Sequence, residues 1–123
     1  MRHLGAQLRQ VASGRVEIWL PYSERVVQQQ GGFHGGAMGA LADIAGGYAA
    51  LTLAPDGMEV VTVEYKINFL GSFQGGVLHA VGEVVKPGKR LIITTAEVLH
   101  VAESGKRSPC AVMQQTIMPV PLN

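Results

Sequence analysis

The sequence is poor in cysteine and shows no N-terminal targeting signal. Cys110 is the one cysteine in 123 residues, which excludes an intramolecular disulfide and favours a reducing compartment. The first residues, MRHLGAQLRQVASG, lack the apolar run of a secretory signal peptide. We therefore expect a cytoplasmic protein. Because the residues around Cys110 alternate as in a strand, we expect it to be a buried structural thiol.

Charge is scarce as well. Charged residues make up 15% of the chain and hydrophobic residues 47%, and the net charge is +1 at pH 7. No block of Lys and Arg is longer than a pair, which argues against a nucleic-acid-binding surface. The length predicts one domain, residues 1–123. So few charges indicate that part of the surface is buried against another copy of the chain.

No stretch has the composition of a membrane span. Residues 33–55 are long enough to cross a bilayer, but their strongly apolar residues are few and Asp43 lies at the centre. Glycine and alanine alone do not drive insertion well. We therefore expect no membrane-spanning segment.

Common cofactor and metal motifs are also missing. The segment GGFHGGAMG lacks the Gly-Lys-Ser/Thr ending of a Walker A loop, and His34 stands where a dinucleotide fingerprint needs glycine. The four histidines have no metal-ligand spacing, and there is no G-x-S-x-G elbow. We expect neither a metal nor a cofactor, and no serine hydrolase chemistry.

Alternating residues predict strands over much of the chain. RVEIWLPY predicts a strand that ends at Pro21. From Met58, a period-two pattern predicts a half-buried strand with one apolar face, formed by Val61, Val63, Tyr65, Ile67 and Phe69. Three more strands are predicted over residues 76–85, 91–102 and 109–120, and the short links between successive strands predict antiparallel pairing. Residues 1–12 instead predict a short amphipathic helix, with Leu4, Leu8 and Val11 on one side.

Residues 36–50 are unusual because ten of these 15 residues are Gly or Ala. Each of four glycines inside a helix costs about 1 kcal/mol relative to alanine, so something must offset that cost. Small residues let a helix lie close against a curved sheet and against a second helix. The sequence therefore predicts an α+β fold, in which a long antiparallel β-sheet wraps around a central Gly/Ala-rich α-helix.

Candidate chemistry is concentrated at this helix. His34, Gly35 and Gly36 stand at its predicted start, and Asp43 lies within it. A helix N-terminus offers unpaired N–H groups and partial positive charge, which suit a substrate carbonyl oxygen that gains negative charge during attack. Asp43 is a candidate general base or nucleophile. The alternative is that His34 caps the helix and Asp43 faces solvent.

The spacing of His34 and Asp43 bears on assembly. Nine residues at about 1.5 Å each separate the two backbones by roughly 13–14 Å, and nine steps of about 100° turn Asp43 onto the opposite face. One chain cannot bring both residues to one substrate atom. Two antiparallel helices side by side could bring Asp43 of one chain to the partner's Gly35, so the spacing predicts a dimer with two shared sites.

These features together resemble a known family. A helix that opens His-Gly-Gly, an acid in "LAD" nine positions after the histidine, and four alternating strands are similar to the hotdog-fold acyl-CoA thioesterases. The nearest group is the PaaI-like branch of the 4-hydroxybenzoyl-CoA thioesterase superfamily, and the resemblance covers about residues 16–119. It implies a hotdog fold, an acyl-CoA substrate, no cofactor, and a homodimer with shared active sites that pairs into a tetramer.

The resemblance also implies roles for individual residues. Asp43 takes the place of the catalytic acid, the Gly35 backbone N–H polarises the thioester carbonyl, and His34 supports that oxyanion site. Gln28, six residues before His34, would orient the attacking water or the carboxylate. Thr62 matches a Ser/Thr position that helps to hold the water in some members, with an ordinary strand threonine as the alternative.

A second segment, VKPGKRLI, resembles the loop that binds the nucleotide end of coenzyme A in relatives. It implies phosphate contacts from Lys89 and Arg90, with Gly88 allowing the turn. The alternative is a solvated hairpin.

The predicted activity is therefore hydrolysis of an acyl-CoA thioester to a free acid and CoA, with Asp43 acting as general base or as nucleophile. Two alternatives stay open: a non-catalytic hotdog protein that binds acyl-CoA, and a hotdog dehydratase or hydratase. The sequence does not indicate whether the acyl group is aryl or alkyl.

Overall fold

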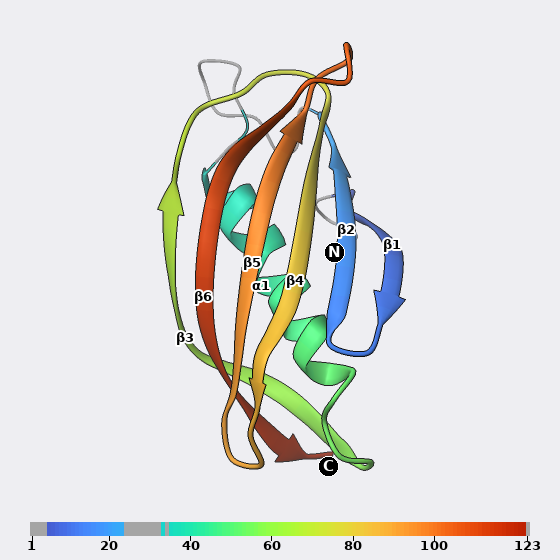
Figure 1. Ribbon diagram of the computed structural model, residues 1–123, viewed down its shortest axis with the longest axis vertical. Coiled ribbons are helices and arrows are strands. Elements are labelled where there is room, and N and C mark those ends of the chain that lie inside the picture. The colour runs from blue at the N-terminus through green and yellow to red at the C-terminus, as the bar shows by residue number, and fades with distance from the viewer. Residues whose placement is uncertain (1–4, 24–32, 34, 123) are drawn as a thin grey trace.

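A computed structural model describes residues 5–23, 33 and 35–122, and in these residues one antiparallel sheet of six strands curves around one α-helix (Figure 1). The elements in chain order are β1 (Gln7–Ala12), β2 (Arg15–Pro21), α1 (Gly35–Leu51), β3 (Met58–Phe69), β4 (Val77–Pro87), β5 (Ile92–Val101) and β6 (Arg107–Pro121). The spatial order of the strands is β1-β2-β4-β5-β6-β3. The predicted α+β architecture, a long sheet around a Gly/Ala-rich helix, is confirmed.

The inner face of the sheet packs on α1 because apolar residues alternate along the strands. Val16, Ile18 and Leu20 of β2 are fully buried, as are Leu41 of the helix and Leu78 of β4. Their burial removes apolar surface from water, which is the main favourable term in folding. The helix and the sheet therefore share one inner core.

Two glycines allow helix and sheet to approach closely. A Cβ atom at Gly82 of β4 would overlap the carbonyl oxygen of Ala45 in α1. A Cβ atom at Gly46 of α1 would overlap the side-chain oxygen of Gln115 in β6 and lie 2.8 Å from Thr94 Oγ1 in β5. Gly39 and Gly47 have no such crowding from described atoms. Close approach therefore explains some of the helix glycines and leaves others without a packing reason within the chain.

The first strand corrects one prediction. Residues 7–12 form β1 and not a helix, and pair antiparallel with β2. The turn between them contains Gly14 at φ 74°, a conformation that suits glycine. Leu8 and Val11 are exposed because β1 lies at the edge of the sheet. Because all residues of β1 are exposed, its apolar residues do not alternate with polar ones as they would on a half-buried strand. Their spacing was therefore wrongly interpreted as one face of a helix.

The pairing and the burial of β3 correct two more predictions. Antiparallel pairing of successive strands holds for β4 with β5 and for β5 with β6, but β3 pairs with β6 and not with β4. The strand is also not half-buried: Val61, Val63, Tyr65 and Phe69 are exposed, with Val63 at 56%. The reason is that β3 is the other edge of the sheet. Its alternating apolar residues therefore have no cover among the described residues of this chain.

The described residues contain no helix that is long and apolar enough to cross a membrane.

Candidate functional site

Asp43 lies in the middle of α1, half-buried, at the mouth of an open cavity of about 350 Å³ between the helix and β3. The helix lines it with Asp43, Ile44, Gly47, Tyr48 and Leu51, and β3 lines it with Glu59, Val60 and Thr62. The polar groups among these residues are two carboxylates and the hydroxyls of Tyr48 and Thr62. Such a mixture of apolar walls and a few polar groups is typical of small-molecule sites.

Two side chains donate hydrogen bonds to the same oxygen of Asp43. Thr62 Oγ1 donates to Asp43 Oδ1 at 2.8 Å. Gln115 Nε2 also donates to Asp43 Oδ1, and it lies 3.3 Å from the backbone oxygen of Asp43 and 3.2 Å from Thr62 Oγ1. No described side chain donates to the other oxygen, Oδ2. The structure thus brings Thr62, a predicted site residue, to Asp43.

Gln115 and Thr94 were missed by the sequence reasoning. Gln115 is 1% exposed in β6 and Thr94 is fully buried in β5, where the two residues face each other across the strand pair. Thr94 Oγ1 donates to Gln115 Oε1 at 2.7 Å. A signal was present in the sequence: the period of two along VMQQTIM places Gln115 on the same face as Met113 and Ile117, which are buried.

The first helical residues lie far from Asp43 within one chain. Gly35 is the first residue of α1, so its N–H has no acceptor within the helix, and Gly36, which is exposed, follows it. Eight residues of helix separate the Gly35 and Asp43 backbones by roughly 12 Å. The structure therefore does not bring Gly35 to Asp43 of the same chain.

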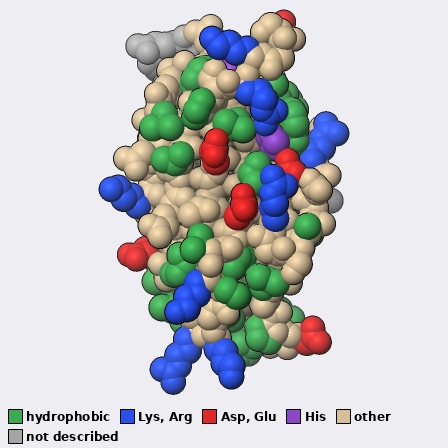
Figure 2. All heavy atoms as spheres, viewed as in Figure 1, with side chains coloured by type: hydrophobic (Ala, Val, Ile, Leu, Met, Phe, Trp, Pro, Cys, Tyr) green, Lys and Arg blue, Asp and Glu red, His purple; other side chains and the backbone are tan. Residues whose placement is uncertain are grey.

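The predicted coenzyme-binding loop is the hairpin between β4 and β5. Lys89 and Arg90 are exposed there, and a Cβ atom at Gly88 would overlap the carbonyl oxygen of Leu91. Basic side chains gather at the end of the molecule where this hairpin lies (Figures 1 and 2). None of the three residues lines the cavity at Asp43.

Of three further predicted residues, only Cys110 can be placed. Gln28 and His34 lie outside the described residues. Cys110 is fully buried in β6, as expected, and burial raises the pKa of its thiol to about 11. That thiol is protonated at neutral pH and is shielded from solvent, which makes it a poor nucleophile.

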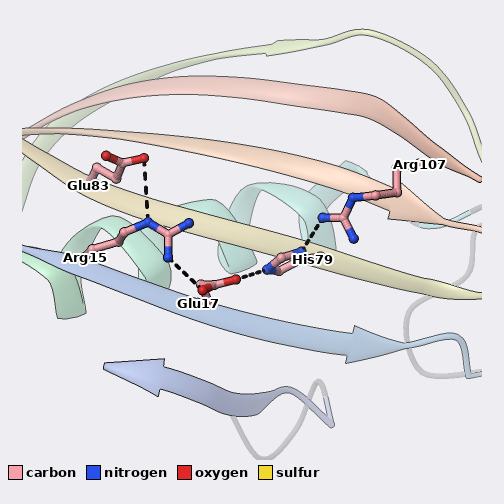
Figure 3. Close-up of polar contacts among 5 residues, drawn as sticks. All are labelled: Arg15, Glu17, His79, Glu83 and Arg107. Carbon is pink, nitrogen blue, oxygen red and sulfur yellow. Dashed lines mark hydrogen bonds and ion pairs between the residues drawn. The ribbon is translucent and has the colours of Figure 1, made fainter. Parts of the chain in front are cut away.

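A second group of titratable side chains lies on the outer face of the sheet (Figure 3). His79 is 6% exposed and stacks on Trp19, with 4.6 Å between ring centroids. Its Nε2 lies 2.6 Å from Glu17 Oε1, and Arg107 Nη2 donates to its Nδ1 at 2.7 Å. Arg15 Nη1 donates to Glu17 Oε2 at 2.7 Å. Chiefly the hydrogen bond from Arg15, and then the one with His79, lower the pKa of Glu17 against the opposing effect of burial.

Comparison with known proteins agrees with the resemblance found in the sequence. Residues 30–104 match the family model of the thioesterase superfamily. A 1,4-dihydroxy-2-naphthoyl-CoA hydrolase of Listeria monocytogenes is 33% identical over 87 residues, which are 70% of this chain and 70% of that protein.

Solved structures give the same result. A thioesterase family protein from Silicibacter pomeroyi superposes with a TM-score of 0.95 at 37% identity, over 99% of this chain and 89% of that one. The E. coli PaaI protein shares the fold, with a TM-score of 0.83 at 22% identity over 97% and 82% of the two chains. The predicted resemblance to hotdog-fold thioesterases is thereby confirmed, and the chain belongs to the thioesterase superfamily of hydrolases.

Proposed function

We propose that this hydrolase acts on acyl-CoA and releases a free acid and CoA, with Asp43 as its catalytic carboxylate. The observation that carries the proposal is the carboxylate of Asp43 itself. Thr62 and Gln115 both donate to Oδ1, and Oδ2 stays without a donor among the described residues, beside a cavity of about 350 Å³. The name of the Listeria relative, a hydrolase of an acyl-CoA, supports this substrate class.

The geometry serves both routes that the sequence left open. As general base, Asp43 takes a proton from water while the water oxygen bonds to the thioester carbonyl carbon. As nucleophile, Asp43 bonds to that carbon itself, and water then hydrolyses the resulting anhydride. In both routes the C–S bond breaks, and the CoA sulfur leaves with the electron pair and takes up a proton. Thr62 holds the carboxylate or the attacking water.

The oxyanion that forms in either route needs donors, and we assign these to the helix start of a second chain. The N–H of the partner's Gly35 would donate to the carbonyl oxygen, supported by the partner's His34, with Gly36 beside it in the substrate site, and Gln28 would orient the water or the carboxylate. Two features support a shared site: the 12 Å or so between Gly35 and Asp43 in one helix, and the exposed apolar residues of the edge strand β3. An exposed apolar edge strand is normally covered.

The remaining assignments follow from the same proposal. Lys89 and Arg90, on the turn that Gly88 permits, bind the phosphates of coenzyme A. The chain forms one domain, it assembles as a dimer that pairs into a tetramer, and it acts in the cytoplasm without a cofactor.

A thiol-release screen tests the activity. The purified chain is offered aryl-, short-, medium- and long-chain acyl-CoAs, and the released thiol is followed by a colour reaction. We expect turnover with at least one acyl class. Tight binding of acyl-CoA without thiol release would contradict hydrolysis and would favour the acyl-CoA-binding alternative.

A further inference from the structure

Gln115 is a polar side chain in an apolar row. The inward-facing residues beside it on β6, Met113 and Ile117, are apolar, and Gln115 is 1% exposed among them. Burying an amide costs free energy unless each of its polar ends is hydrogen-bonded. Both ends are bonded here: the oxygen accepts from Thr94 and the nitrogen donates to Asp43. The cost of burial is thus offset by bonds that end at the proposed catalytic carboxylate.

The direction of the Gln115 amide is fixed by its partners. A carboxylate can only accept hydrogen bonds, so the Nε2 end must face Asp43. The Oε1 end then faces Thr94, whose hydroxyl donates to it at 2.7 Å. Thr94 is fully buried and lies opposite Gln115 in the β5–β6 register, so it has no solvent to compete for that bond. A rotation of the amide by half a turn would place its oxygen against the carboxylate of Asp43 and lose that bond, because two acceptors would then face each other.

Gly46 provides the space for this pair. A Cβ atom at this position would overlap Gln115 Oε1 and lie 2.8 Å from Thr94 Oγ1. Glycine inside a helix costs about 1 kcal/mol relative to alanine. Glycine stands at this position of the helix because the buried amide of Gln115 and the hydroxyl of Thr94 leave no room for a side chain.

We propose that Gln115, oriented by Thr94 and accommodated by Gly46, is a positioning residue for the thioesterase reaction. It anchors Asp43 through Oδ1 and thereby turns Oδ2 toward the cavity. There Oδ2 reaches the attacking water or the carbonyl carbon of the thioester. The inference rests on the proposed function, since it assigns Gln115 a role in the work of Asp43. Gln115 acts through Asp43 and does not itself touch the substrate.

The test is Gln115→Glu, which preserves shape and changes the donor. The introduced carboxyl group still accepts from Thr94, but it can donate to Asp43 only while it is protonated. When both groups are ionised they repel each other. The pH profile of kcat should therefore gain a descending limb at higher pH, as the introduced carboxyl group ionises, and the wild-type profile should lack that limb.

The matched control is Gln114→Glu, the same change at the neighbouring residue, which faces outward and is exposed. It should keep the wild-type profile. Gln115→Met, which removes the donor, should lower kcat roughly 10- to 100-fold with little change in KM, since a hydrogen bond to a charged group is lost. A purely structural role would scale the rate of Gln115→Glu equally at every pH, and that result would overturn the proposal.

Two measurements keep the inference testable on its own. If Gln115 variants fail to fold, Thr94→Val should lower kcat and Thr94→Ser should restore it, because serine keeps the orienting hydroxyl; equal rates for the two would overturn the proposal. Without any substrate, the carboxyl ¹³C resonance of Asp43 should respond to ionisation of the introduced carboxyl group in Gln115→Glu and show no such response in Gln114→Glu. The absence of that response in Gln115→Glu would overturn the inference, whereas a wild type that releases no thiol would overturn the proposed function alone.

Discussion

Asp43 and Glu17 are both carboxylates held by two donors, but the two sites differ in which oxygens are used. The donors to Asp43 converge on Oδ1. The donors to Glu17 are divided, with Arg15 on Oε2 and His79 on Oε1. Asp43 therefore has an oxygen left for a substrate beside a cavity, whereas both oxygens of Glu17 are engaged on the outer face of the sheet (Figure 3).

The comparison extends to the neighbouring groups. A guanidinium can only donate, so His79 Nδ1 must accept from Arg107, and its Nε2–H donates to Glu17. Both ring nitrogens of His79 are thus occupied. An acid, a histidine and an arginine in contact look like catalytic machinery. Here they join three strands, and every carboxylate oxygen and ring nitrogen in the group has a hydrogen-bond partner. A carboxylate oxygen without a donor, such as Oδ2 of Asp43, is the better indication of a reactive group.

The largest expected effect is a difference in kcat/KM between a variant of Asp43 and a variant of Glu17. Asp43→Asn keeps the shape and removes the base or nucleophile, so kcat/KM for the best acyl-CoA should fall by at least roughly 10²-fold. Glu17→Gln should leave kcat/KM unchanged, because Glu17 does not line the cavity. Circular dichroism checks that both variants fold. Wild-type turnover by Asp43→Asn would remove Asp43 from the mechanism.

Two adjacent glycines of α1 test how closely the Gln115–Thr94 pair beside Asp43 packs against the helix. Gly46→Ala should lower the free energy of unfolding by about 1–3 kcal/mol, because the added methyl group overpacks the buried amide and hydroxyl. Gly47→Ala meets no described atom within 4 Å and should gain up to about 1 kcal/mol from helix propensity. Urea unfolding measures both. Equal effects would mean that the Gln115–Thr94 pair does not press on the helix.

The coenzyme hairpin should affect binding and not chemistry. Replacing Lys89 and Arg90 by alanine should raise KM roughly tenfold with little change in kcat, because phosphate contacts are made equally in the ground and transition states. A truncated thioester without the nucleotide should show no such increase. Lys106→Ala, in the exposed β5–β6 turn at the other end of the sheet, is the control. An equal loss with both substrates would indicate a structural role for the hairpin.

The smallest effect concerns the outer network and pH. Because the folded pKa of Glu17 is lowered below 4.5, its stabilising contribution is complete above that pH and is lost as the pH falls through the lowered value. Glu17→Gln should therefore have a lower Tm than the wild type at pH 7, and this difference should shrink as the pH falls below 4.5. Glu103→Gln, an exposed turn residue, should show no such trend. A Tm difference that is constant with pH would argue against a role for the Glu17 charge.

The sequence predicted the parts of the fold that one chain determines locally. The strands β2, β4, β5 and β6 follow from periodicity, since each has a face that packs on the shared core, and the helix follows from its run of small residues. The predictions failed at the two edges of the sheet. There β1 and β3 have apolar residues that this chain does not cover, so periodicity no longer reports burial.

The site was predicted less completely, for a physical reason. Asp43 and Thr62, which the structure brings together, were both named as candidates from the sequence, the former from its place in an apolar helix. Gln115 and Thr94 were not, because a polar residue in a strand is usually exposed and its burial depends on a partner distant in sequence. Gln115 lies 72 residues from Asp43, and only the pairing of β6 beside the helix brings them together.

Mixing two inactive variants tests the shared site most directly. One parent is Asp43→Asn. The other is Gly35→Pro, which removes the N–H that is assigned to the oxyanion; proline is tolerated at the first helical position, and a Cβ atom there meets only the Phe69 ring at 3.8 Å. After verified subunit exchange, about half of the dimers are mixed, and each has one intact site, so about a quarter of all sites should hydrolyse acyl-CoA. Thiol release that stays at the level of the folded, inactive parents would contradict a site built from Asp43 of one chain and the partner's Gly35.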